Sequence, residues 1–208
     1  SFQFQNMNMG KSPSITDGIV MPLFGNMNVI LLLILPSITM RLFAEEKKLH
    51  TIELLLTAPL TLGEIIVGKY LSAALFLATM LGVTAVYPII LLLTGNPDVG
   101  PLFTNLLGTF LMGCCVLSVG VFCSSVTENQ IVAGVLAFSA GISFWLVSWA
   151  SQWAGPVWGD VLSYLSLISH YNNFARGLLS TADLLYYFSF IGTGLFLTHR
   201  VLDSYRWR

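Results

Sequence analysis

Charged residues are scarce in this chain. Lys, Arg, Asp and Glu make up 9% of its 208 residues, against roughly 25% in an average soluble domain. Hydrophobic residues make up 55%, and they fall in uninterrupted runs, which a soluble core does not need and a bilayer span of about 20 residues does. The composition therefore excludes a soluble domain and is typical of a membrane protein. The net charge of −1 gives no sign of the basic surface that a nucleic-acid partner would require.

Five apolar runs contain no charged residue, and we interpret each as a membrane span: residues 19–40, 72–94, 104–126, 131–154 and a shorter run at 184–198. Together they predict an all-α polytopic helical bundle that forms one transmembrane domain over residues 1–208. Cysteine is also scarce, and all three cysteines lie in the run 104–126: Cys114, Cys115 and Cys123. A small packing role suits them better than a disulfide or a metal site.

The predicted spans also lack histidine. Ion-coupled carriers and pumps usually place ionisable residues at membrane depth, so the energy for any transport should arrive through a water-exposed surface. Two near matches to a phosphate-binding loop fail, because Tyr70 replaces the magnesium-binding Ser or Thr after Lys69, and Gln5 replaces the first Gly before Lys11. We therefore predict no catalysis, cofactor or metal in this chain, with ATP and Mg²⁺ bound by a separate ATPase.

Basic residues are distributed unequally between the two sides of the predicted membrane. Lys11 and Arg176 lie on one side. Seven basic residues lie on the other side: Arg41, Lys47, Lys48, Lys69, Arg200, Arg206 and Arg208. Because cytoplasmic loops hold the excess of Lys and Arg, we predict that segment 41–69 and the C-terminus are cytoplasmic and that residues 1–18 form an external loop. With that loop outside, we expect six spans in the parent protein, with both ends inside.

Segment 41–69 carries eight of the nineteen formal charges. Its apolar residues recur near helical spacing, which predicts an amphipathic helix lying along the membrane until Pro59 ends it. Thr61 and Glu64 have the spacing of a capping box. They predict the start of a helix that continues through Lys69 into the second span.

Segment 155–183 has a different character. It predicts external interfacial or re-entrant helices before the last span, and its apolar residues share one helical face: Trp158, Val161, Leu162, Leu165 and Ile168. Ser180 and Asp183 repeat the capping-box spacing before the last span. Ser166, Ser169 and His170 weakly indicate a hydrolase, but no GxSxG motif accompanies them, and we expect no intramembrane acid to orient the histidine.

Three stretches resemble a known family. The first is residues 41–59, which contain RLFAEEKK and TIELLLTAP, together with Gly68-Lys69. The other two are residues 168–177 (ISHYNNFARG) and 205–208 (YRWR). They resemble the permease subunits of the type 2 ATP-binding-cassette family, most closely its gliding-motility-type branch. The resemblance implies a six-span parent, a coupling helix seated in the ATPase subunit, and an outer gate formed by residues 155–183. It also implies a complex of two permeases and two ATPases.

We predict that the ATPase contacts the coupling segment through polar and apolar residues: Glu45, Glu46, Lys47, Lys48, Leu49, Thr51, Ile52, Glu53 and Leu55. The gate candidates are Trp158, Leu162, Leu165, His170, Phe174 and Arg176. The predicted function is an exporter permease in the bacterial cytoplasmic membrane, with ATPase subunits, a second permease and the lipid bilayer as partners. Two alternatives stay open: a membrane scaffold that passes ATPase motion to a partner complex and, more weakly, an intramembrane enzyme.

Overall fold

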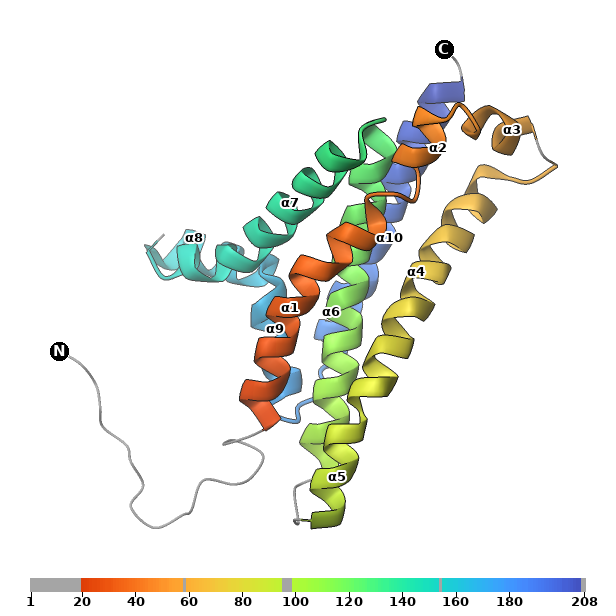
Figure 1. Cartoon of the computed structure of the whole chain (residues 1–208). Helices are drawn as coiled ribbons and strands as arrows, with labels where there is room; N and C mark the ends of the chain where they lie inside the picture. The colour runs from red at the N-terminus through yellow and green to blue at the C-terminus, as the bar shows by residue number, and fades with distance from the viewer. Residues whose placement is uncertain (1–19, 58, 95–98, 154, 207–208) are drawn as a thin grey trace, which may run out of the picture.

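The computed structural model describes residues 20–57, 59–94, 99–153 and 155–206, and these ranges form helices and turns without a strand (Figure 1). The helices are α1 (Met21–Thr39), α2 (Ala44–Lys48), α3 (Ile52–Thr57), α4 (Leu62–Thr84), α5 (Val86–Thr94), α6 (Val99–Val126), α7 (Gln130–Ser151), α8 (Gly155–Leu165), α9 (Leu167–Ala175) and α10 (Thr181–Arg206). The predicted all-α bundle is therefore confirmed for this part of the chain. The predicted external loop 1–18 lies outside the described residues.

Four helical stretches among the described residues are long and apolar enough to cross a membrane: Met21–Lys48, Leu62–Ile90, Val99–Val126 and Gln130–Ser151. They contain most of the first four predicted spans. The predicted fifth span, 184–198, lies inside α10, which has 26 residues. This helix is not one of the four, because charged residues and His199 near its two ends lower its mean hydropathy. A fifth span therefore stays a prediction.

Helix α6 lies at the centre of the bundle and packs against α1, α4, α7, α9 and α10 (Figure 1). Two of its glycines allow this close approach. A Cβ atom at Gly113 would lie 2.6 Å from Leu77 of α4, and one at Gly120 would collide with Thr39 of α1. Small residues at such contacts let membrane helices pack through their backbones.

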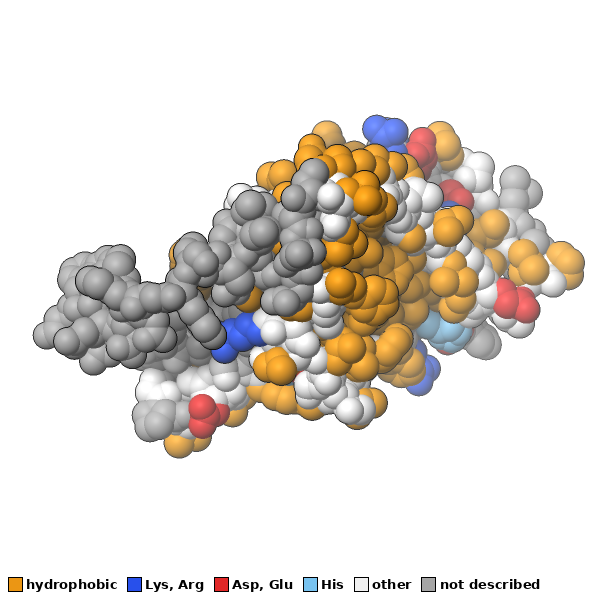
Figure 2. All heavy atoms as spheres, turned by 90° about the horizontal axis from the view of Figure 1, so that it is seen from below, with side chains coloured by type: hydrophobic (Ala, Val, Ile, Leu, Met, Phe, Trp, Pro, Cys, Tyr) orange, Lys and Arg blue, Asp and Glu red, His pale blue; other side chains and the backbone are white. Residues whose placement is uncertain are grey.

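The outward faces of these helices are apolar. On α4 alone, exposed large hydrophobic side chains follow one another along the helix: Val67, Leu71, Leu75, Phe76 and Val83. Seen from below, hydrophobic side chains cover much of the described surface, and few charged side chains are visible (Figure 2). Backbone groups are satisfied inside the helices, so this surface is suited to lipid.

Candidate functional site

Residues 41–57 form a bent segment, which we call the hook, at the end of the bundle where α10 ends (Figure 1). The prediction of one continuous amphipathic helix is wrong, because α2 and α3 are separate. The Thr51 amide donates to the Glu46 carbonyl and the His50 amide to the Lys47 carbonyl, while His50 has a φ of 56°. These are the bonds and the left-handed residue of a Schellman motif, which ends α2 and turns the chain.

The hook is fastened to the last turn of α6. The Ser124 hydroxyl accepts hydrogen bonds from the Phe43 and Ala44 amides, each 3.0 Å long, and donates one of 3.0 Å to the Met40 carbonyl. The buried Lys47 ammonium donates to the Ser125 carbonyl. Carbonyls in the last turn of a helix lack intrahelical partners and favour a cation, so these contacts stabilise both elements.

The hook is also fastened to α4 and α10. The Lys69 ammonium lies 2.5 Å from the Glu46 carboxylate and 2.5 Å from the Leu42 carbonyl. The Lys47 ammonium lies 4.6 Å from the centre of the Tyr205 ring of α10, within cation–π range. The hook therefore contacts three long helices through two lysines and one serine.

One edge of the hook remains exposed and is mostly polar, with Leu49 as its large apolar residue: Glu45, Lys48, Leu49, His50, Thr51 and Glu53. The structure thus divides the predicted coupling residues into two groups. Lys47 and Ile52 face the chain's own interior, Glu46 is tied to Lys69, and Leu55 packs partly against the core. These four residues fasten the hook to the rest of the chain.

At the other predicted functional segment, the chain forms two helices, α8 and α9, before α10. Ser166 separates them, and its hydroxyl accepts from the Ser169 amide at 3.4 Å as the N-cap of α9. The gate candidates divide accordingly. On α8, Trp158 and Leu165 are exposed and Leu162 is half-buried. On α9, His170 and Phe174 are buried, and Arg176, which follows α9, is exposed.

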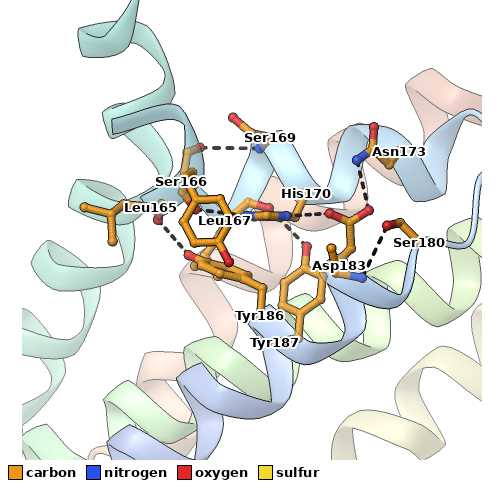
Figure 3. Close-up of polar contacts among 12 residues, drawn as sticks. Leu165, Ser166, Leu167, Ser169, His170, Asn173, Ser180, Asp183, Tyr186 and Tyr187 are labelled. Carbon is orange, nitrogen blue, oxygen red and sulfur yellow. Dashed lines mark hydrogen bonds and ion pairs between the residues drawn. The ribbon is translucent and has the colours of Figure 1, made fainter. Parts of the chain in front are cut away.

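The predicted capping box at Ser180 and Asp183 does not form, because Asp183 turns toward α9 (Figure 3). Its carboxylate lies 2.5 Å from Nδ1 of His170 and accepts from the Asn173 amide group at 2.9 Å. The Ser180 hydroxyl accepts instead from the Ala182 amide. An acid therefore does orient His170, from the residue before the predicted fifth span, and the absence of an intramembrane acid stays a prediction. The thirteen-residue separation hid the pair from a search for local motifs.

This histidine–carboxylate pair is not arranged as a nucleophile and its base. Nε2 of His170 lies 2.9 Å from the Tyr164 carbonyl, so both ring nitrogens already have protein partners. The Ser166 hydroxyl serves as a helix cap. Within the described ranges, no cluster of three or more His, Cys, Asp or Glu residues can hold a metal ion.

Tyr171, one residue further along α9, carries a second buried contact to α6. Its hydroxyl donates to Oδ1 of Asn105 at 3.0 Å, and the Asn105 amide group donates to the Ala175 carbonyl at 3.2 Å. Burial raises the pKa of the Tyr171 hydroxyl, which therefore remains a donor. Together these bonds hold α9 to the centre of the bundle.

The sequence was compared with protein-family models and with curated proteins. The family described as "ABC-2 family transporter protein" matches residues 4–199, most of the chain. No curated protein matches it. The match includes both the hook and the α8–α9 segment, so the two candidate functional segments lie within the region that defines the family.

Proposed function

Since the chain belongs to the ABC-2 transporter family, whose members are permease subunits that are generally not catalytic, we propose that its hook is the element on which a partner ATPase acts. The observation that carries the proposal is the division of the hook into an exposed polar edge and a fastened inner side. A soluble partner can contact the edge, while the inner side transmits displacement to the bundle.

The path of that displacement follows from the fastening contacts. A force on α2 acts on α6 through Ser124 and Lys47, and on α4 through the Lys69–Glu46 ion pair, because packed interiors transmit strain rather than absorb it. Helix α6 contacts most of the other helices in the bundle. Movement of the hook would then change the packing of several long helices at once.

The proposal includes membrane placement and assembly. Helix α10 is proposed as the fifth span, since it packs beside α6 over much of its length, and 26 residues at about 1.5 Å rise per residue are enough to cross a bilayer. The excess of basic residues at the hook end supports a cytoplasmic location for the hook in a bacterial cytoplasmic membrane. A second permease copy and two ATPases would complete an exporter.

The exposed edge gives a direct test. The double variant Lys48→Glu/Glu53→Lys reverses two exposed charges. Neither side chain has a hydrogen bond or ion pair with another described side chain. We expect the variant to fold but to lose at least tenfold in affinity for the ATPase, since charge complementarity governs such contacts. The measurement is the dissociation constant between purified permease and ATPase in lipid nanodiscs.

The matched control is Asp160→Lys, which reverses an exposed charge on α8 and should leave ATPase affinity unchanged. Equal affinity in the hook variant and the parent protein would show that the ATPase does not bind this edge. A loss in both variants would point to a general charge effect and would also refute the assignment.

A further inference from the structure

The ring of His170 lies between two hydrogen-bond acceptors that belong to two other helices. The Asp183 carboxylate of α10 faces Nδ1 at 2.5 Å, and the Tyr164 carbonyl of α8 faces Nε2 at 2.9 Å (Figure 3). His170 and Asp183 are both buried. This one side chain therefore links α8, α9 and α10.

The number of protons on the ring decides whether both links can exist. A neutral imidazole has one N–H, so it can donate to Asp183 or to Tyr164 but not to both. The doubly protonated ring donates to both acceptors and also balances the charge of the carboxylate. In the neutral ring, a lone pair faces one acceptor oxygen, and the link to the Tyr164 carbonyl is the weaker because that acceptor carries no formal charge.

No other charged group replaces the histidine. Among the described residues, Asp183 has no Lys or Arg partner. Helix α7, which packs on α9, contains no titratable residue. Apart from Asp183, the titratable side chains around the ring belong to α10, α8 and α6 and carry no charge when protonated: Tyr186, Tyr187, Tyr164 and Cys115. Cys115 faces the Tyr187 backbone.

We propose that His170 is a proton-dependent latch that holds the turn of α8 at Tyr164 to α9 and α10 when the ring is doubly protonated and releases this turn when the ring is neutral. The sign follows from the hydrogen bonds: the latch is closed at low pH and is lost as pH rises through the titration of the ring. Imidazole is the side chain that ordinarily changes charge between pH 5 and 8.

The release has a defined location. Tyr187 donates to the Leu167 carbonyl at 3.0 Å, a bond that does not depend on the histidine and keeps the start of α9 in place. Tyr164 and Leu165 of α8 form part of the wall of a cavity of about 460 Å³ between α6, α7, α8 and α10. The Tyr186 hydroxyl of α10 donates to the Leu165 carbonyl at 2.7 Å, and this bond is likewise independent of the histidine. The release is therefore confined to the turn of α8 at Tyr164, on the wall of this cavity, while Leu165 and α9 stay bound to α10.

The first experiment follows ring protonation and helix opening in the same sample. The full chain, with ¹⁵N-labelled histidine, is placed in lipid nanodiscs, and ring-nitrogen chemical shifts are recorded from pH 5 to 9. Amide hydrogen exchange of peptides covering residues 160–167 is measured over the same range and corrected for intrinsic rates. We expect about tenfold faster exchange once the ring is neutral, in step with its titration, because a charge-assisted hydrogen bond is lost.

Two variants separate the latch from a purely structural ion pair. Asn at position 183 can donate to a neutral ring nitrogen and still accept from Asn173, so Asp183→Asn should keep α8 closed and remove the pH dependence. His170→Gln removes the titrating ring and should leave exchange at 160–167 independent of pH. His199→Gln, a histidine near the other end of α10, is the matched control and should behave as the parent protein does.

Two results would overturn the proposal. One is exchange at residues 160–167 that does not change while the His170 ring signals pass from doubly protonated to neutral. The other is an Asp183→Asn variant in which α8 opens at every pH, because a charged pair rather than a proton count would then hold the helix. Neither readout depends on ATPase binding, so failure here is distinguishable from failure of the proposed function.

Discussion

The hook and the α8–α9 segment are both short helical segments fastened to the long helices, but they present opposite surfaces. The hook exposes charged and polar residues such as Glu45, Lys48 and Glu53, whereas α8 exposes large apolar ones such as Val157 and Trp158. Polar and charged side chains suit a soluble partner, while tryptophan is enriched where protein meets the lipid headgroups. The comparison agrees with the proposed contact between the hook and a soluble partner, and it favours contact with lipid for α8.

The two segments also differ in the chemistry of their fastening. Lysine ammonium groups fasten the hook, because Lys47 and Lys69 donate to backbone carbonyls and Lys69 also pairs with Glu46. In the α8–α9 segment, the proposed latch is the imidazole of His170, which links α8 to α10. A segment that transmits force needs a constant attachment, and a segment that opens needs a reversible one.

The largest effect that separates the two segments is expected from Ser124→Ala. The hydroxyl takes part in two hydrogen bonds with the hook and in a third with Met40, the residue before it, each worth about 1 kcal/mol. We expect the free energy of opening of residues 41–57 to fall by about 3 kcal/mol, measured by amide hydrogen exchange, with no change in residues 155–175. Ser204→Ala is the control, since that hydroxyl bonds only within α10. Unchanged hook exchange would contradict the fastening role.

The second prediction, Gly108→Ala, perturbs the packing of α9 and leaves the hook unchanged. A Cβ atom there would lie 2.7 Å from Cβ of Phe174 on α9, and overpacking typically costs about 1–3 kcal/mol. Exchange in α9 should increase while the hook remains protected. The matched control is Gly68→Ala, where nothing lies within 4 Å of the added atom. Equal effects of the two alanines would show that α9 does not pack as closely as described.

A smaller effect is expected at the end of α9, where Gly177 has a φ of 81°. Gly177→Ala places a side chain in the left-handed region, at a cost of roughly 1–2 kcal/mol, and its Cβ atom would also lie 3.1 Å from Pro101. Thermal unfolding in detergent should show the loss. Gly192→Ala, which has open space and lies within α10, should not destabilise the protein.

The smallest effect is expected at the corresponding position of the hook, where His50 occupies the left-handed site. His50→Gly should preserve the turn and stabilise the hook by about 1 kcal/mol, because glycine adopts this conformation without steric cost. Exchange of residues 49–52 should become slower. Faster exchange in the glycine variant would mean that the His50 side chain itself supports the turn.

Local sequence rules predicted some of this structure correctly. Thr61 and Glu64 form the predicted capping box, with the Glu64 carboxylate 2.8 Å from the Thr61 amide, because both partners lie within one turn of the chain. The same spacing at Ser180 and Asp183 failed because His170, brought near by the fold, offered the carboxylate a closer partner. Spacing alone cannot anticipate such a competitor.

The bend of the hook and the direction of its side chains were also beyond local rules. Helical spacing predicts one helix through His50, since histidine is uncommon at a left-handed helix end, where glycine is usual. Burial of Lys47 depends on the free carbonyl of Ser125 and the ring of Tyr205, which lie far along the chain. Periodicity identified the segment as amphipathic but not which of its charges faces inward.

Lys47 and Lys48 are neighbours in sequence with opposite assigned roles, and they offer the most direct measurement of the central claim. The rate of ATP hydrolysis by the partner ATPase and its affinity for the permease are measured in nanodiscs with Lys47→Met and with Lys48→Met. We predict that Lys47→Met retains affinity but loses at least tenfold in permease-dependent stimulation, while Lys48→Met weakens affinity. Full stimulation with Lys47→Met would contradict transmission of ATPase motion through the fastened side of the hook.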